Sequence, residues 1–394
     1  MSWLGRKKIA FVPVHRPNAH PPDDPVPADW PNEIRRRVFY DPDPVSNQDM
    51  SLRTYVQKVS SGRADLDGSV MPMLTIDEQN VDFKIVEPLV GAQLRAQGFD
   101  AAAIVMLGGP GAGTSEQGGF WARFAMQEEI GTWAMELIHV LGNIFDTRSL
   151  PSYIDSRNAE GDISGFDEMG SNLGMHPIAW TKERVAWLDE SAIAQHRSGS
   201  GNYDLHAIGL PQPAPTGRWS AVRVGSVVPY LMIEARLKVD QFESPRLLSR
   251  GLPGQPVNGD RMHPGIASEG VIVYRVQTTD TRGNSQNQLI PVFLLTRIAL
   301  GVGQSFTSDN GIKVQVRAAI AGGFSITVND PFHVAVPDVL FELEKAATTA
   351  VHKAGLVAQF VHSGTWVGSQ SPTGGSVVAR GSTVTMSLRP GAPP

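Results

Sequence analysis

Residues 131–142 read Gly-Thr-Trp-Ala-Met-Glu-Leu-Ile-His-Val-Leu-Gly. Apolar residues recur through and just before this stretch at spacings of three and four, which predicts a helix over residues 128–141 with one face in a core. The stripe that we expect to face the core consists of Ile130, Ala134, Leu137, Ile138 and Leu141. The neighbouring face, which a cleft would use, carries Met135, Glu136, His139 and Gly142.

This second face has the spacing of a zinc-binding helix with one residue changed. In a His-Glu-x-x-His helix two imidazoles one turn apart bind zinc, and the Glu between them polarises the zinc-bound water. Glu136, His139 and Gly142 keep that register, but Met135 stands where the first His belongs. A thioether is a soft, neutral ligand that suits copper(I) and binds zinc poorly beside hard oxygen donors. We therefore expect an impaired zinc site.

The composition excludes several function classes. The chain has 394 residues, 41% of them hydrophobic, which suits two or three domains. A formal net charge of -5 gives no electrostatic reason to expect nucleic acid as a partner. The absence of cysteine excludes disulfides, thiolate metal sites and Cys nucleophiles. We expect no membrane span, because no stretch of about 18 apolar residues occurs, and the first residues lack the apolar region of a signal peptide.

The hydrophobic patterns predict alternating strands and helices in the first half of the chain. Strands are predicted at residues 8–14, 64–70 and 101–107. Helices are predicted at residues 32–39, 52–60, 86–97 and 176–188. A glycine-rich segment, residues 108–115, follows the third strand, but Thr114 stands where a phosphate-binding loop needs lysine. We expect these glycines to let the backbone turn tightly past a cleft.

Acidic residues and a methionine follow the 128–141 helix. Asp146 and Asp155 are candidate metal ligands in an irregular stretch, residues 143–162. Met169 follows an acidic pair about thirty residues after the helix, and a methionine at such a turn forms the apolar floor of many zinc sites. From Trp219 onward, segments 220–236, 270–276, 289–295 and 312–316 read as strands separated by turns. They predict an antiparallel sandwich packed on the helical part.

Taken in order, these segments resemble the immune-inhibitor-A-like secreted metallopeptidases, a zincin family. The resemblance runs over roughly residues 8–330 and rests on segments 8–14, 55–62, 118–121, 130–142, 166–170, 176–188, 231–236 and 270–276. It implies that Glu136 is the general base and that His139 is a zinc ligand. The third ligand would be an acidic residue soon after the helix, and Asp146 is the nearest match, one place beyond the usual spacing. Family members are extracellular.

The end of the chain resembles a PASTA domain. The matching motifs are Val-Pro-Asp at 336–338, Ala-Gly-Leu at 354–356, Gln-Ser-Pro-Thr-Gly at 370–374 and Gly-Ser-Thr-Val at 381–384. One departure is Leu340-Phe341, where the family usually has a glycine. PASTA domains bind cell-wall muropeptides or other proteins elsewhere, so the resemblance implies a bacterial setting. The alternative is a spacer that binds nothing.

We therefore predict an α+β chain of three domains: a zincin-like domain at 1–218, a β-rich sandwich at 219–332 and a PASTA-like module at 333–394. The predicted function is a metal-dependent hydrolase of the peptidase kind, with Glu136 as general base and zinc on His139 and Asp146. Two alternatives stay open. One is a pseudopeptidase that binds a peptide or small ligand in the cleft without cutting it, and the other is a metal-free enzyme that uses Glu136 and His139 as an acid/base pair. A cell-wall fragment or a protein is the expected partner of the PASTA-like module.

Overall fold

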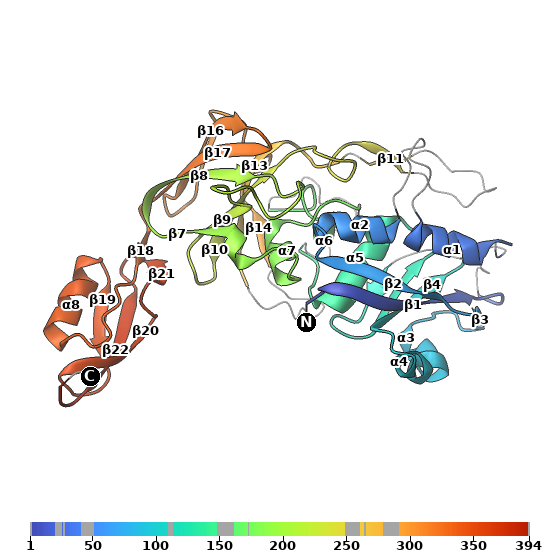
Figure 1. Cartoon of the computed structure of the whole chain (residues 1–394), viewed down its shortest axis with the longest axis horizontal. Coiled ribbons are helices and arrows are strands. Elements are labelled where there is room, and N and C mark those ends of the chain that lie inside the picture. The colour runs from blue at the N-terminus through green and yellow to red at the C-terminus, as the bar shows by residue number, and fades with distance from the viewer. Residues whose placement is uncertain are drawn as a thin grey trace.

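The computed structural model describes residues 2–19, 26, 28–40, 51–108, 113–147, 161–171, 173–248, 261–263, 265–278 and 291–392. Asp155 lies outside these ranges. The described chain is a mixed α+β protein with several sheets (Figure 1), as the sequence predicts. None of its described helices combines the length and hydrophobicity that a bilayer crossing requires.

The first sheet has the strand order β2-β1-β4-β6-β5, and β3 also pairs with β1. Strands β1, β2, β4 and β6 run parallel, whereas β5 runs antiparallel to β6 at the edge. The predicted strands at 8–14, 64–70 and 101–107 are confirmed. The strands are β1 (Gly5–His15), β2 (Ala64–Val70), β3 (Leu74–Thr75), β4 (Ala101–Met106), β5 (Thr114–Ser115) and β6 (Trp121–Ala125).

Helices cover both faces of this sheet. One face packs with α1 (Trp30–Phe39), α2 (Leu52–Val59) and α5 (Ile130–Gly142) in the main core. The other face packs with a helical run whose parts are α3 (Phe83–Val86), the π-helical turn η1 (Glu87–Gly91) and α4 (Ala92–Ala96). The predicted helices at 32–39, 52–60, 86–97 and 128–141 are thereby confirmed as elements.

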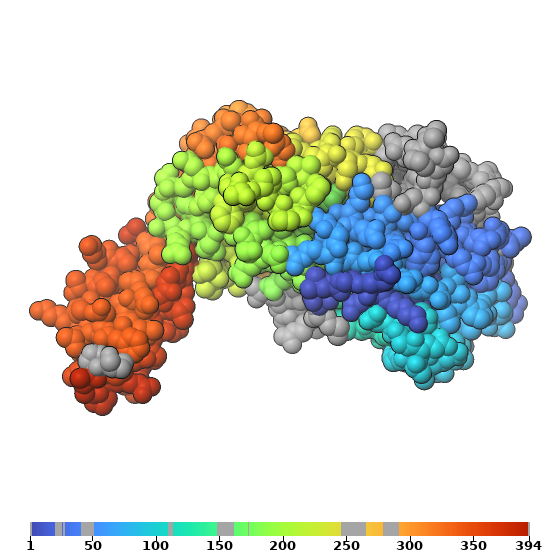
Figure 2. Space-filling view, viewed as in Figure 1, coloured from blue at the N-terminus to red at the C-terminus, as the bar shows by residue number. Residues whose placement is uncertain are grey.

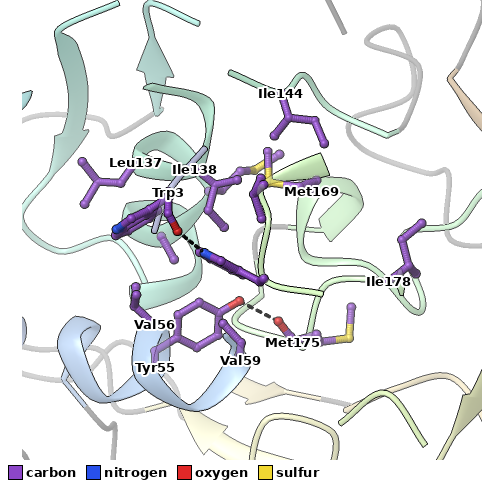
Figure 3. Close-up of a cluster of buried hydrophobic side chains, with 14 of the residues drawn as sticks. Trp3, Tyr55, Val56, Val59, Leu137, Ile138, Ile144, Met169, Met175 and Ile178 are labelled. Carbon is purple, nitrogen blue, oxygen red and sulfur yellow. Dashed lines mark hydrogen bonds between the residues drawn. The ribbon is translucent and has the colours of Figure 1, made fainter. Parts of the chain in front are cut away.

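Helix α5 differs from its prediction in burial. The sequence predicts one buried stripe, but every residue from Gly131 to Gly142 is buried. The reason is that α5 lies between the sheet and the segments that follow it. Figure 3 shows Leu137 and Ile138 of α5 beside Ile144, Met169 and Trp3 in the main core. Gly142 is needed for this packing, because a Cβ there would lie 2.6 Å from Cγ1 of Val185.

The predicted helix at 176–188 is mostly wrong. Only α7 (Ala179–Arg184) is helical, after a short α6 (Glu168–Ser171). Ala186 adopts a left-handed φ of 67°, which ends the helix. The chain then turns back, and the amides of Trp187 and Leu188 both donate to the carbonyl of Lys182.

The next part of the chain forms two sheets that share a second core. Their orders are β14-β13-β10-β9-β7 and β15-β16-β17-β8. Two strands come from before residue 219, and β7 pairs in parallel with β9, unlike the predicted antiparallel arrangement. A parallel pair needs a long connection, and this one passes through the other sheet as β8. The strands are β7 (Ile193–His196), β8 (Gly199–His206), β9 (Ala221–Val224), β10 (Tyr230–Arg236), β13 (Gly270–Val276), β14 (Val292–Leu294), β15 (Ser305–Thr307), β16 (Lys313–Ile320) and β17 (Gly323–Asp330), with β11 (Arg246–Leu248) and β12 (Arg261–His263) as a separate pair.

The C-terminal module has a hydrophobic core of its own. Its three-stranded sheet has the order β19-β22-β20, and β18 pairs with β21 beside it. Figures 1 and 2 show it projecting from the rest of the chain. The elements are β18 (His333–Ala335), α8 (Glu344–Lys353), β19 (Val357–Phe360), β20 (Trp366–Ser371), β21 (Val377–Ala379) and β22 (Thr383–Arg389).

Candidate functional site

Helix α5 ends where the candidate site begins. Asn143 ends it in the left-handed conformation, with φ 54° and ψ 47°, a role that asparagine and glycine fill most easily. The carbonyl of His139 accepts from the amides of Asn143 at 3.1 Å and Gly118 at 2.9 Å. Gly118 belongs to the turn between β5 and β6, so this turn is fastened to the end of α5. The chain then turns back and brings Asp146 toward His139.

Both ring nitrogens of His139 have partners. Nδ1 lies 2.6 Å from the carbonyl oxygen of Ile144, and because a carbonyl only accepts, Nδ1 carries the proton and donates. Nε2 lies 3.2 Å from Oδ1 of Asp146. The structure therefore brings the predicted residues His139 and Asp146 together, although Asp146 is one place beyond the spacing that the family resemblance implies.

The environment favours the charged form of His139. Burial alone would lower the pKa of His139, but the hydrogen bond and charge of Asp146, together with the charge of Glu136, outweigh burial and raise it to about 9. At neutral pH the ring is thus an imidazolium that donates to the Ile144 carbonyl and forms an ion pair with the Asp146 carboxylate.

Glu136 is the third member of the site and is only 6% exposed. Burial raises the pKa of Glu136, while the charge of His139 and a hydrogen bond from Ser115 oppose the rise. Gly113 lies directly against this carboxylate, since a Cβ at Gly113 would come within 2.1 Å of Oε1. The glycine-rich segment was predicted to pass close to a cleft, and at Gly113 the backbone does lie against the carboxylate of Glu136. Residues 109–112 lie outside the described chain. No pattern in the sequence singled out Ser115.

The two methionines of the predicted site are core residues. Met135 is 1% exposed and belongs to the main core, so apolar volume fills the predicted position of the first zinc ligand. Met169, the predicted floor residue, is fully buried in the same core near Ile138 (Figure 3). Its carbonyl accepts from the amide of Thr147 at 3.0 Å, which fastens this turn to the segment after α5.

The donor set does not fit a catalytic zinc ion. Such sites use three protein ligands and leave a position for water or substrate. Of the predicted ligands in the described chain, His139 and Asp146 lie together, whereas Met135 is enclosed by apolar side chains. Within the described ranges, no group of three or more His, Asp or Glu side chains is arranged to hold a metal ion.

The three polar residues are arranged to bind and to exchange protons. Glu136 and Ser115 lie together where β5 forms the edge of the first sheet. An edge strand offers unpaired backbone groups to an added strand. Within the described residues, the arrangement thus places a buried carboxylate and an imidazolium close to the edge strand β5.

A second polar cluster, which the sequence patterns did not reveal, lies between α7 and β10. Arg236 is fully buried, donates to Glu243 at 2.6 Å and to Glu234 at 3.2 Å, and also donates to the carbonyl of His176 at 3.0 Å. Glu234 in turn accepts from the amide of Ala179 at 2.7 Å, at the start of α7. These contacts hold the start of α7 against strand β10 of the five-stranded sheet.

His176 completes this cluster as a neutral ring. Lys182 donates to Nδ1 at 3.2 Å and to the carbonyl of Ile208 at 2.8 Å, so Nε2 carries the proton and donates to Asp240 at 2.8 Å. Burial and the charge of Lys182 lower the pKa of His176 to about 4. Burial and the charge of Arg236 lower the pKa of Lys182 to about 7.

The fold and sites define an α+β protein of several sheets with an independent α/β module at its C-terminal end. Residues 334–389 of that module match the PASTA domain family. A search of curated proteins found no match to the chain.

The predicted PASTA motifs meet in the structure. The side chain of Gln370 accepts from the amide of Val339 at 2.8 Å and donates to the carbonyl of Pro337 at 3.1 Å, which joins two motifs that are far apart in sequence. Phe341, in the Leu340-Phe341 pair where the family usually has a glycine, has a left-handed φ of 67°. Its ring is 54% exposed and lies 5.8 Å from that of Trp366.

Proposed function

We propose that residues 1–218 form a zincin-like module that binds an extended peptide without zinc-dependent cleavage, a pseudopeptidase. The observation that carries this proposal is the state of the two ligand positions on α5. Met135 is buried among apolar side chains, and the imidazole of His139 is already held by Asp146 and the Ile144 carbonyl. A group that is satisfied in this way needs no metal ion.

The family part of the proposal rests on the order of elements. Helix α5, which carries the altered motif, follows strand β6 of a mostly parallel sheet. The turn that contains Met169 packs in the same core as α5, as the resemblance implies. Glu136 keeps its place in the motif, and its carboxylate accepts a hydrogen bond from Ser115 of the edge strand β5.

The edge strand suggests the kind of ligand. Strand β5 pairs with β6 on one side and ends the order of the first sheet in the described chain. An extended peptide binds such an edge by main-chain hydrogen bonds, and pockets for alternate side chains give specificity. Glu136 would then accept a hydrogen bond from the bound peptide, since a buried carboxylate favours a donor.

The PASTA domain suggests where this module works. PASTA domains often bind cell-wall fragments, and we propose that residues 334–389 bring the peptide-binding module to such material. The test compares the full chain with a chain that lacks these residues, in sedimentation with insoluble peptidoglycan. Equal co-sedimentation of the two proteins would refute this role.

The main proposal is tested by peptide binding and cleavage measured on one sample. A library of extended peptides is incubated with the chelator-treated protein and then with the protein plus zinc. The proposal predicts binding that zinc does not change, with no cleavage in either condition. Zinc-dependent cleavage that is lost in Glu136→Gln would refute it.

Metal-dependent hydrolysis, with Glu136 as general base, is the second candidate function. One observation favours it: Nε2 of His139 and Oδ1 of Asp146 are 3.2 Å apart. Two ligands of one tetrahedral zinc ion lie about 3.3 Å apart when each is about 2 Å from the metal. Residues 148–160, which include Asp155, would have to supply a further ligand.

A further inference from the structure

A cavity of about 930 Å³ opens at one end of the two-sheet unit. One wall comes from strands β9, β10, β13 and β14, and the opposite wall comes from β15 and the turn before β16. His333, at the start of the module that contains the PASTA domain, also lines it. Volumes of about 300–1,000 Å³ are typical of small-molecule sites, which occur preferentially at boundaries between domains.

An arginine points into this cavity from a core position. Strand pairing aligns Leu231 with Arg275 and Arg275 with Phe293, so the three side chains lie on one face of the sheet. Val273 and Val271, two and four residues earlier on the same strand, face the core shared by the two sheets. Alternation therefore directs Arg275 between the sheets, where an apolar residue would be expected.

The guanidinium of Arg275 is stacked and has no acidic partner. Its central carbon lies 5.2 Å from the centre of the Phe293 ring. Within the described chain, no hydrogen bond or ion pair to this guanidinium is found, and Arg297 on the same wall is likewise unpaired. A charged group in a partly enclosed site is costly unless it is paired.

Within the described chain, the two acids that line the cavity form no ion pair with Arg275. Both oxygens of Asp162 are used by Ser164, which donates from its amide at 2.9 Å and from its hydroxyl at 2.6 Å. Asp309 is exposed. His333 donates from Nδ1 to Asp330 at 2.9 Å, which leaves its other nitrogen free to face a ligand.

We propose that this cavity binds a carboxylate-bearing ligand with an apolar body, and that Arg275 receives the carboxylate. A guanidinium stacked on an aromatic ring is held in place, and its planar fork matches a carboxylate with two parallel hydrogen bonds. Phe293, Phe306 and Leu231 supply the apolar surface for the rest of the ligand. The site is separate from Glu136 and does not depend on the proposed function.

Two matched pairs of probes test the site by calorimetry on the full chain. N-acetyl-leucine and N-acetyl-leucinamide differ only in the carboxylate, as a peptide end would present it. N-acetylmuramic acid and its carboxamide make the same comparison for a sugar acid. We expect at least one acid to bind, and its neutral partner to bind about tenfold more weakly or worse. The acid that binds identifies the source of the carboxylate.

Variants then assign the carboxylate to Arg275. Arg275→Gln should weaken acid binding about tenfold, and Arg275→Lys should weaken it less, because lysine keeps the charge but loses the planar fork. Arg317→Gln is the control, since Arg317 is exposed on β16 away from the cavity, and it should not change binding. The proposal is overturned if neither acid binds, if acid and neutral partner bind equally, if only inorganic phosphate binds, or if folded Arg275→Gln binds like the wild type.

Discussion

Buried His139 and partly buried Asp146 form a pair in which Nε2 of the ring lies 3.2 Å from Oδ1 of the carboxylate. The other nitrogen of the ring, Nδ1, donates to the carbonyl of Ile144, five residues after His139, at 2.6 Å. The pair satisfies His139 without a metal ion, and Met135 fills the space beside it. This relationship is the physical basis of the proposed loss of zinc chemistry.

The first prediction concerns the charge of His139. Asp146 is the main group that raises the pKa of His139 to about 9 against the effect of burial. Asp146→Asn should therefore bring that pKa well below 9 and leave the ring neutral at pH 8. The measurement is an NMR titration of the imidazole in chelator-treated protein, with the resonance assigned by its loss in His139→Gln. An unchanged pKa in Asp146→Asn would contradict the geometry.

The second prediction concerns the contact between Gly113 and Glu136. A Cβ at Gly113 would meet Oε1 of Glu136 at 2.1 Å, so Gly113→Ala should displace the buried Glu136 side chain or the edge strand and cost about 1–3 kcal/mol of the free energy of unfolding. Gly301→Ala is a matched control, because the nearest atom to its Cβ would be Oε1 of Gln304 at 3.7 Å. Urea unfolding measures both. Equal stability of the two variants would show that β5 does not approach Glu136 this closely.

The third prediction concerns the pH dependence of stability. The pKa of His176 in the folded chain is about 4, below its ordinary value of 6.5. Between pH 6.5 and 4 the unfolded chain therefore binds a proton that the folded chain does not, so the contribution of His176 to stability is lost as the pH falls. The loss is at most about 3 kcal/mol over this range, at about 1.4 kcal/mol per pH unit.

The comparison of variants isolates this contribution from the neighbouring acids. Burial raises the pKa of Glu243 to about 7 and that of Asp167 to about 6, so both titrate in the same range. The free energy of unfolding of the wild type should fall more steeply between pH 6.5 and 4 than that of His176→Gln. His352→Gln, on the exposed face of α8, should behave like the wild type. Parallel curves for wild type and His176→Gln would rule out a neutral buried His176.

The fourth prediction concerns restoration of the first ligand. Met135→His would place an imidazole one helical turn before His139, as in the complete motif. We expect this variant to gain zinc affinity relative to the wild type, and to be less stable without zinc because it buries a polar ring in the main core. Met135→Leu keeps the apolar volume and is the control. Equal zinc affinity in Met135→His and Met135→Leu would contradict the assignment of position 135 to the first zinc ligand of the motif.

Local patterns in the sequence predicted most of the elements that build the first sheet and its helices. Residues 8–14 and 101–107 are apolar runs long enough for buried strands, and they became β1 and β4. The altered motif also led to Glu136, His139 and Asp146, which the structure brings together. These successes share one cause, because periodicity and spacing along a single element are local properties.

The features that the sequence did not predict depend on distant contacts. The helix at 176–188 is cut short by the left-handed turn at Ala186, which no pattern in that segment requires. Arg236 and Arg275 look like the polar residues of half-exposed strands, but one is fully buried and the other points between two sheets. Strand β20 was missed, because Gly368 and polar residues interrupt its apolar pattern.

The most direct test of the central claim is the zinc content of the wild-type protein after incubation with zinc and removal of free metal. The account predicts no stoichiometric zinc, because His139 is held by Asp146 and Met135 replaces the first ligand. One zinc ion per chain that disappears in both His139→Ala and Asp146→Ala would contradict it.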